Sequence, residues 1–130
     1  MVTTGAQTFA GAKTFNSDIK VNDITVGGGS QTYGNTALGY LTLASNQPAS
    51  YNAGSWNTAI GHSAMYRNTN GNYNTAIGKS ALTNNTTGKY NQAFGHQALC
   101  ANTTGSCNVA VGYGSLLNNI VGVNNTAIGV

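Results

Sequence analysis

The chain has 130 residues, of which 5% are charged, and its formal net charge is +3 at pH 7. Asn, Gly and Thr account for 54 of the residues, and the only acidic residues are Asp18 and Asp23. This length allows one folded domain with a small core at most. Disordered chains combine low hydrophobicity with high net charge, and the charge here is low. The apolar runs are too short for membrane insertion, and no charged segment precedes an apolar one as in a signal peptide.

The charged residues argue against two classes of function. The basic residues are scattered and form no patch for the phosphates of a nucleic acid: they are Lys13, Lys20, Arg67, Lys79 and Lys89. No carboxylate follows Asp23, whereas glycan-cleaving enzymes generally use a pair of carboxylates. We therefore expect no nucleic-acid partner, no enzymatic activity and no cofactor.

Residues 1–34 do not share the repeat that follows them. Two Thr-Phe pairs within residues 7–15 precede a stretch, residues 19–26, in which apolar and polar residues partly alternate. Such alternation is typical of a strand or a strand hairpin. Residues 27–30, Gly-Gly-Gly-Ser, predict a flexible joint, because no helix follows that would make them a phosphate-binding loop. We interpret residues 1–34 as an N-terminal strand or stalk segment and residues 35–130 as a repeat domain.

The repeat domain is built on a motif of Asn, a variable residue, Ala, an apolar residue and Gly. Its units start at residues 35, 57, 74, 91, 108 and 125, so the spacing is 17 residues after a longer first unit. The extra residues of the first unit lie around 47–51. Counted from the Asn, positions 1 and 12 are Asn, position 3 is Ala, positions 5 and 15 are Gly, and positions 4 and 9 are apolar. Agreement in so many columns is a strong indication of a repeat architecture.

Each unit predicts one coil of an all-β fold. Seventeen residues are too few for a helix pair, and Asn, Gly and Thr are poor helix formers. Two short strands fit instead, one over positions 2 to 6, as in residues 58–62, and one near positions 7 to 10, as in residues 80–83. Residues 84–88 then form a turn rich in Asn and Gly. The prediction is a parallel β-roll or β-solenoid whose coils stack about 4.8 Å apart.

Stacking places equivalent residues above one another. We expect the side chains of positions 4 and 9 to form apolar ladders inside the roll, and the Asn columns to satisfy turn amides. The predicted ladder residues are Asn57, Asn74, Asn91, Asn108, Ile60, Ile77, Phe94 and Val111. On this assignment, Ile77→Asp would bring an unpaired charge into the ladder and prevent folding or assembly. Since each coil offers only two or three sizeable apolar side chains, we also expect several chains, most simply three, to pack side by side.

Candidate recognition residues lie in the variable columns. Position 6 carries polar and aromatic side chains, which suits either a recognition surface or an ordinary solvent-facing column: these are Tyr40, His62, Lys79, His96 and Tyr113. Position 17 is aromatic in three units, where rings either stack on sugars or cap the edge of the core. Trp56 in that column lies near the insertion in the first unit. Arg67, the single arginine, is a further candidate for contact with an acidic receptor group.

The histidines and cysteines do not indicate metal binding or catalysis. His62 and His96 lie two coils apart, about 10 Å at the coil spacing, and cannot chelate one metal within a chain. Cys100 and Cys107 bracket one turn, so a disulfide between them and two reduced thiols are both possible. No His–carboxylate pair accompanies either cysteine. We expect no metal site.

The repeated Asn-Thr-Ala-Ile-Gly unit, with its Asn-Thr-Thr-Gly turns and Ser-Ala-Leu or Gln-Ala-Leu segments, resembles the head repeats of trimeric autotransporter adhesins. It resembles still more the related repeats of bacteriophage tail fibre proteins, and residues 5–27 are similar to the piece that precedes such repeats. The resemblance implies a left-handed parallel β-roll in which three chains wind into one rod. It also implies a place in a virion tail fibre or at a cell surface, and a receptor that is a host glycan or an outer-membrane component.

The function expected from the sequence is therefore that of a non-catalytic structural and host-recognition segment of a trimeric fibre. The repeat stops at Val130, so we expect a fragment of a longer fibre or a processed product. One alternative is a self-assembling filament in which the next chain completes the last unit. Another is an ice- or crystal-binding solenoid, because position 2 carries a Thr column that Gln92 and Val109 interrupt: Thr36, Thr58, Thr75 and Thr126.

Overall fold

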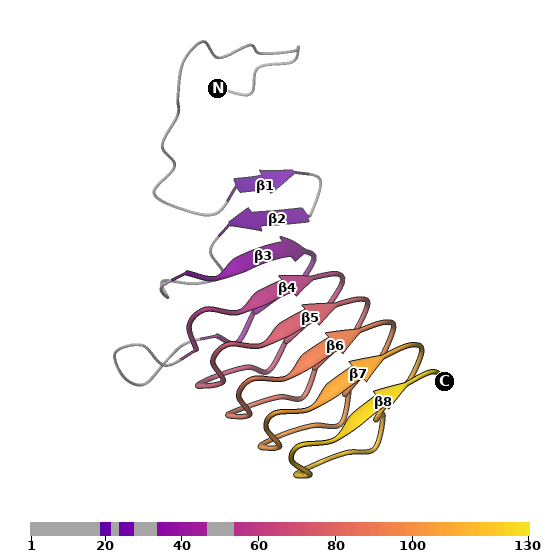
Figure 1. Cartoon of the computed structure of the whole chain (residues 1–130). Coiled ribbons are helices and arrows are strands. Elements are labelled where there is room, and N and C mark those ends of the chain that lie inside the picture. Colours follow the sequence, from indigo (N-terminus) through magenta and orange to yellow (C-terminus); the bar gives the residue numbers. More distant parts are fainter. Residues whose placement is uncertain (1–18, 22–23, 28–33, 47–53) are drawn as a thin grey trace, which may run out of the picture.

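The computed structural model describes residues 19–21, 24–27, 34–46 and 54–130. Within these ranges the regular secondary structure is all β-strand, without a helix. The strands form one sheet in chain order. They are β1 (Ile19–Val21), β2 (Ile24–Gly27), β3 (Thr36–Gly39), β4 (Thr58–Ile60), β5 (Thr75–Ile77), β6 (Gln92–Phe94), β7 (Val109–Val111) and β8 (Thr126–Ile128). Figure 1 shows them side by side, from β1 at one end of the row to β8 at the other.

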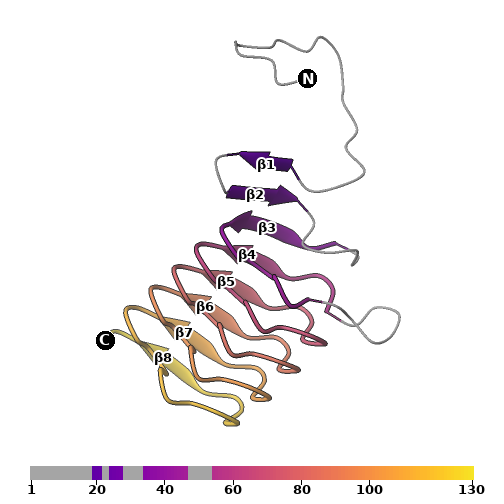
Figure 2. The same cartoon turned by 180° about the vertical axis from the view of Figure 1, so that it is seen from behind.

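Strands β3 to β8 form a parallel β-solenoid. Each strand pairs in register with the next, so that Ala76 in β5 lies between Ala59 of β4 and Ala93 of β6. From the ends of β4, β5, β6 and β7 the chain returns behind the sheet to the start of the next strand (Figure 2). One 17-residue unit therefore makes one coil, and equivalent residues lie above one another, as the repeat predicts.

Strands β1 and β2 continue the sheet in the antiparallel sense. Lys20 pairs with Thr25 within this hairpin, and Val26 pairs with Leu38 of β3. The sequence predicted a strand or a strand hairpin over residues 19–26, and the structure has the antiparallel pair β1–β2, which covers the sheet edge at which the solenoid begins. The Thr-Phe pairs, residues 28–30 of the proposed joint and the insertion at 47–51 lie outside the described residues.

Each coil contains one short strand instead of the two expected. The strand predicted over residues 58–62 ends at Ile60, and Gly61 follows with a φ of 129°. The second predicted strand, residues 80–83, is a turn, because Ser80 and Leu82 have left-handed backbone with φ of 59° and 50°. Left-handed φ is incompatible with an extended strand. All five complete units share these left-handed residues at positions 7 and 9.

These turns are nevertheless hydrogen-bonded from coil to coil. The amide of Ser80 donates to the carbonyl of His62 in the preceding coil at 2.9 Å. The amide of Leu82 donates to the carbonyl of Ala98 in the following coil at 3.0 Å. The return segment thus satisfies its backbone groups as a strand would, although its backbone has a different shape.

The interior of each coil holds one large apolar side chain. The position-9 side chains form the predicted ladder and are fully buried in four coils: Leu43, Met65, Leu82 and Leu99. Small side chains from positions 3 and 8, such as Ala76 and Ala81, fill the remaining space. The core is therefore thin, and the small side chains allow the strand and the return segment to approach closely.

The position-4 side chains lie outside the coil, so their predicted place in the interior is wrong. Successive side chains of a strand point to opposite faces, and the Ala at position 3 points inward. Position 4 therefore points outward: Ile77 is 37% exposed, and Ile60, Phe94 and Val111 are only half-buried. They still form a continuous column, because the strands pair in register. A charge at Ile77 would lie on the face of the sheet and not in the core.

Two columns of buried asparagine run through the interior. In the position-1 column the side-chain oxygen of Asn57 accepts from the backbone amide of Asn74 at 2.9 Å, and the oxygen of Asn74 accepts in the same way from Asn91 at 2.9 Å. In the position-12 column the side-chain nitrogen of Asn85 donates to the side-chain oxygen of Asn68 at 3.0 Å. The expected asparagine ladders are therefore present, and there are two of them.

The two ladders meet at the carbonyl of the Gly at position 15. The oxygen of Gly88 accepts from the side-chain nitrogen of Asn74 at 2.8 Å and from that of Asn85 at 3.1 Å. The same pair of bonds recurs at Gly54, Gly71, Gly105 and Gly122. A Cβ on Gly88 would overlap the carbonyl oxygen of Gly105 in the next coil, so only glycine fits at this turn.

We predict that Asn74→Ala destabilises the protein by about 2–3 kcal/mol, because it leaves the buried amide of Asn91 without its acceptor. Asn118→Ala is the control, since Asn118 is exposed, and should change the free energy of unfolding by less than about 0.5 kcal/mol. Urea unfolding at one protein concentration measures both changes. Equal stability of the two variants would contradict a structural role for the ladder.

A second prediction concerns the left-handed turns. Ser80→Gly should stabilise the fold by about 0.5–1 kcal/mol, because glycine adopts a φ of 59° without steric cost. Ser80→Ala keeps the strain and should bring no such gain. Gly114 already occupies position 7 in another unit, with a φ of 61°. A thermal melt in which both variants shift equally would argue against strain at this position.

Candidate recognition surface

The position-6 side chains form a column at one corner of the coils. Tyr40, His62, Lys79 and Tyr113 are exposed, and His96 is half-buried. Two pairs of rings are in contact: the ring centroids of Tyr40 and His62 lie 5.5 Å apart, and those of His96 and Tyr113 lie 5.3 Å apart. The structure therefore brings all five residues into one column, with Lys79 on the coil between the histidines.

The Gly at position 5 determines where this column lies. Gly61 has a φ of 129°, and a Cβ there would come within 2.7 Å of the carbonyl carbon of Gly78 in the next coil. The backbones at position 5 are thus stacked without side chains between them. The chain turns sharply at the end of the strand, and the next residue, such as His62, projects from the corner into solvent.

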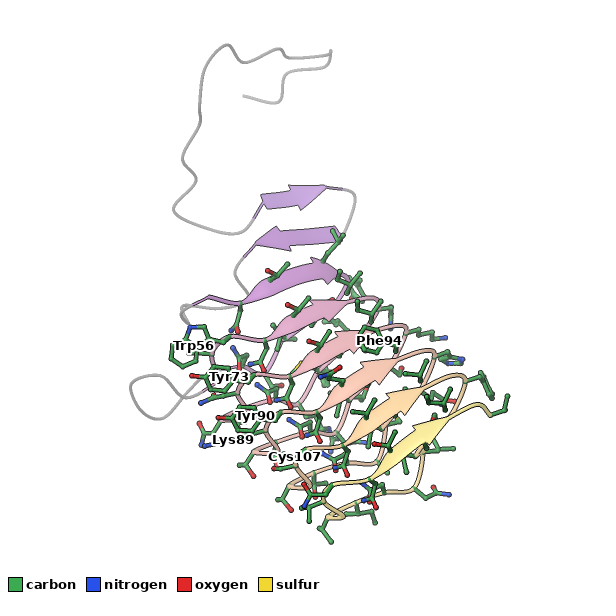
Figure 3. The ribbon with its side chains drawn as sticks, viewed as in Figure 1. Trp56, Tyr73, Lys89, Tyr90, Phe94 and Cys107 are labelled. Atoms are coloured by element: carbon green, nitrogen blue, oxygen red, sulfur yellow. The ribbon has the colours of Figure 1, made fainter. Side chains whose placement is uncertain are left out.

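The position-17 side chains form a second column, at the opposite end of the strands. Trp56 and Tyr73 stack with centroids 4.9 Å apart and an angle of 5° between their planes. Tyr73 and Tyr90 stack at 5.1 Å and 1°. We call these three rings the aromatic ladder; Figure 3 shows its rings one above another, with Cys107 further along the same edge.

The stacking of the rings on one another was not anticipated from the sequence. Position 17 has left-handed backbone, with φ of 56° at Trp56 and 58° at Tyr73, which turns the ring to the outside of the coil. Stacked coils lie about 4.8 Å apart, close to the spacing of stacked rings. The three aromatic residues at position 17 were therefore enough, in a sequence with this repeat, to predict that their rings stack on one another.

The aromatic ladder changes the interpretation of its residues. The rings are exposed, so they do not cap the core as one alternative held. Most of the ring faces are covered by neighbouring rings and are closed to a sugar. Trp56 is held between Tyr73 and Gly34, since a Cβ on Gly34 would lie 2.8 Å from Cδ1 of Trp56. Arg67 is exposed on the return segment of its coil and belongs to neither column.

The cysteines are free thiols with different surroundings. Cys107 is exposed, whereas Cys100 is half-buried. Burial raises the pKa of the Cys100 thiol, because the charged thiolate loses solvation. The sequence left open either a disulfide between the two cysteines or two reduced thiols, and the structure has two reduced thiols.

Over the described ranges, no group of three or more His, Cys, Asp or Glu side chains could hold a metal ion. Nor does this part of the chain contain a helix that is long and apolar enough to span a membrane. The exposed rings, imidazoles and lysine of the two columns can bind a polar ligand by hydrogen bonds and ring contacts.

No protein-family model, curated protein or solved structure gives a significant match to this chain.

We predict that Cys107 reacts several-fold faster than Cys100 with iodoacetamide near pH 8. Cys107 is exposed, and the raised pKa of Cys100 lowers the fraction of reactive thiolate. Mass spectrometry of peptides after limited alkylation measures the two rates, and Cys107→Ser identifies the signal of Cys100. Equal rates in the folded protein would contradict the difference in burial.

Proposed function

We propose that the chain is a structural and host-recognition segment of a trimeric fibre, without catalytic function. In this proposal the solenoid is a left-handed β-roll, and three chains wind around one axis. The partner at the surface is a glycan or an outer-membrane component of a host cell. The β-solenoid fold and the resemblance of the repeat to tail fibre and adhesin head repeats support it.

The observation that carries this proposal is an apolar stripe on the outer face of the sheet. The stripe consists of the position-4 residues Leu38, Ile60, Ile77, Phe94, Val111 and Ile128, all exposed or half-buried in the single chain. In-register pairing makes it continuous from β3 to β8. A continuous apolar surface of this kind commonly marks an interface between proteins.

The thin core supplies the reason for assembly. Each coil buries a single large apolar side chain, such as Leu82, so the solenoid gains little apolar burial from its own fold. The second large apolar residue of each coil, such as Ile77, lies on the stripe. Closed symmetric association buries identical stripes against one another. Around a threefold axis parallel to the stack, each coil would contribute one position-4 side chain to a shared core.

Two features of the solenoid bear on the alternative functions. The edge of β3 is covered by β2, so the free edge of another chain's β8 cannot pair with β3 and continue the roll. The Thr column at position 2 is interrupted by Gln92 and Val109 in two adjacent coils, which breaks the regular array that ice binding would need. Neither the filament nor the ice-binding solenoid is supported by an observation of comparable weight.

Ile77→Asp tests the stripe. We expect the wild-type chain to sediment as a trimer at micromolar concentration and this variant to sediment as a folded monomer. Threefold packing would bury three unpaired carboxylates in the interface, whereas in the single chain the side chain stays partly exposed. Sedimentation velocity gives the assembly state, and far-UV circular dichroism shows whether the β-structure is retained.

Thr87→Asp is the matched control, because it adds the same charge at an exposed turn away from the stripe. This control should remain a trimer. A wild-type protein that is monomeric at micromolar concentration would contradict the proposal. So would an Ile77→Asp variant that assembles as the wild type does.

A further inference from the structure

The aromatic ladder has one open end. Tyr73 covers one face of the Tyr90 ring, and Cys107 occupies position 17 in the next coil. The exposed fraction rises along the ladder from 39% at Trp56 to 44% at Tyr73 and 54% at Tyr90. The larger exposure of Tyr90 than of Tyr73, whose ring is stacked on both faces, is the expected effect of an uncovered ring face. Among the described residues, the far face of Tyr90 has no ring against it.

The level beside this face belongs to the coil of Cys107, and stacked coils lie about 4.8 Å apart, close to the spacing of stacked rings. The backbone of Cys107 has a φ of 59°, nearly the 58° of Tyr90, so its side chain leaves the coil where a fourth ring would leave it. A thiol fills only a small part of the volume that a ring would occupy. One coil further lies Asn124, exposed and in the same column with a φ of 58°. We call the space bounded by Tyr90, Cys107 and Asn124 the Tyr90 notch.

Polar groups surround the notch. Lys89 precedes Tyr90 in the chain and is exposed, and Figure 3 shows it beside Tyr90 at the same edge of the solenoid. The backbone amide of Lys89 donates to Oγ of Ser106 at 3.0 Å, which ties this turn to the coil of Cys107. The amide group of Asn124 can both donate and accept hydrogen bonds. No carboxylate follows Asp23 in the sequence, so no acidic side chain of the repeat region repels an anion here.

These features together select a class of ligand. The face of an aromatic ring carries partial negative charge and attracts the polarised C–H groups on the face of a sugar ring. The ammonium group of Lys89 attracts a carboxylate by a charge-assisted hydrogen bond. The remaining sugar hydroxyls can bond to Asn124. A planar aromatic ligand would satisfy the ring face but leave these polar groups without partners.

On the basis of the proposed function, we infer that the Tyr90 notch binds an acidic sugar residue of a surface glycan. The pyranose ring stacks on the free face of Tyr90, at the level of the Cys107 coil, where a fourth aromatic ring would otherwise lie. Its carboxylate lies toward Lys89, and its hydroxyls lie toward Asn124. The ladder behind Tyr90 holds its ring in place, so little side-chain freedom is lost on binding.

The experiment compares acidic and neutral sugars on the whole 130-residue chain. Calorimetry is run with a glucuronic acid-containing tetrasaccharide and with sialyllactose, and with cellotetraose and lactose as their neutral counterparts. We expect at least one acidic sugar to bind about tenfold or more tightly than its neutral counterpart. Tyr90→Ala should weaken the binding about tenfold or more, and Lys89→Ala should remove most of the preference for the acidic sugar.

Cys107→Tyr fills the notch without damaging the fold. Its backbone already has the conformation of Tyr90, so the new ring should extend the aromatic ladder and raise the melting temperature. It should weaken binding of the acidic sugar about tenfold or more, because it occupies the level beside Lys89 and moves the free ring face one coil away. Asn118→Tyr adds the same ring at an exposed position outside the notch and should bind as the wild type does. As an independent readout, the bound acidic sugar should slow alkylation of Cys107.

Four outcomes would overturn the inference. If acidic sugars bind equally well to wild type, Tyr90→Ala and Cys107→Tyr, glycan recognition stands and the notch is not its site. If neutral sugars bind as tightly as acidic ones at Tyr90, the ligand class is wrong. If Asn118→Tyr loses binding as Cys107→Tyr does, the loss does not come from filling the notch. If no sugar binds, the notch assignment fails, while sedimentation of the wild type and Ile77→Asp still decides whether the chain forms a trimeric fibre.

Discussion

The fold depends on one repeated interaction, in which two asparagine side chains donate to the same glycine carbonyl. At Gly88 these donors come from Asn74 and Asn85, and both asparagines are fully buried. Each asparagine is also bonded to its equivalent in the preceding coil. Buried polar groups without partners would be costly, so the pattern is stable only when every coil repeats it. This accounts for the constancy of Asn at positions 1 and 12 and of Gly at position 15 in the units of this chain.

An interior that contains two polar ladders has little room for apolar side chains. Leu82 and its equivalents supply the apolar core, and alanines close the space around them. The second apolar residue of each unit, such as Ile77, lies on the outer face of the sheet. The two polar ladders thus account both for the small apolar core and for the exposure of the stripe. A coil stabilised mainly by hydrogen-bond ladders leaves its remaining apolar surface exposed on the single chain, where the proposed trimer would bury it.

The same stacking organises the surface. Bulky residues such as Leu82 and Tyr73 occupy left-handed backbone positions that side chains usually avoid, and the strain is repeated in every coil. Coil-to-coil hydrogen bonds on both sides of each turn maintain that conformation. One result is the aromatic ladder, in which the rings of Trp56, Tyr73 and Tyr90 stack on one another. Among the described residues, no ring lies against the far face of Tyr90, where the column changes from Tyr90 to Cys107.

The sequence alone determined the coil length, the stacking of equivalent residues and the all-β class, because a fixed spacing of 17 residues translates directly into columns. It also identified the position-6 column and the structural role of asparagines such as Asn74. Only the tertiary structure decided which face of a three-residue strand is inside, since a shift of one residue exchanges the two faces. The constant Ala at position 3 was the sole sequence signal that Ile77 points outward. The orientation of the Tyr90 ring depends on a left-handed turn that local preference does not favour and that neighbouring coils impose.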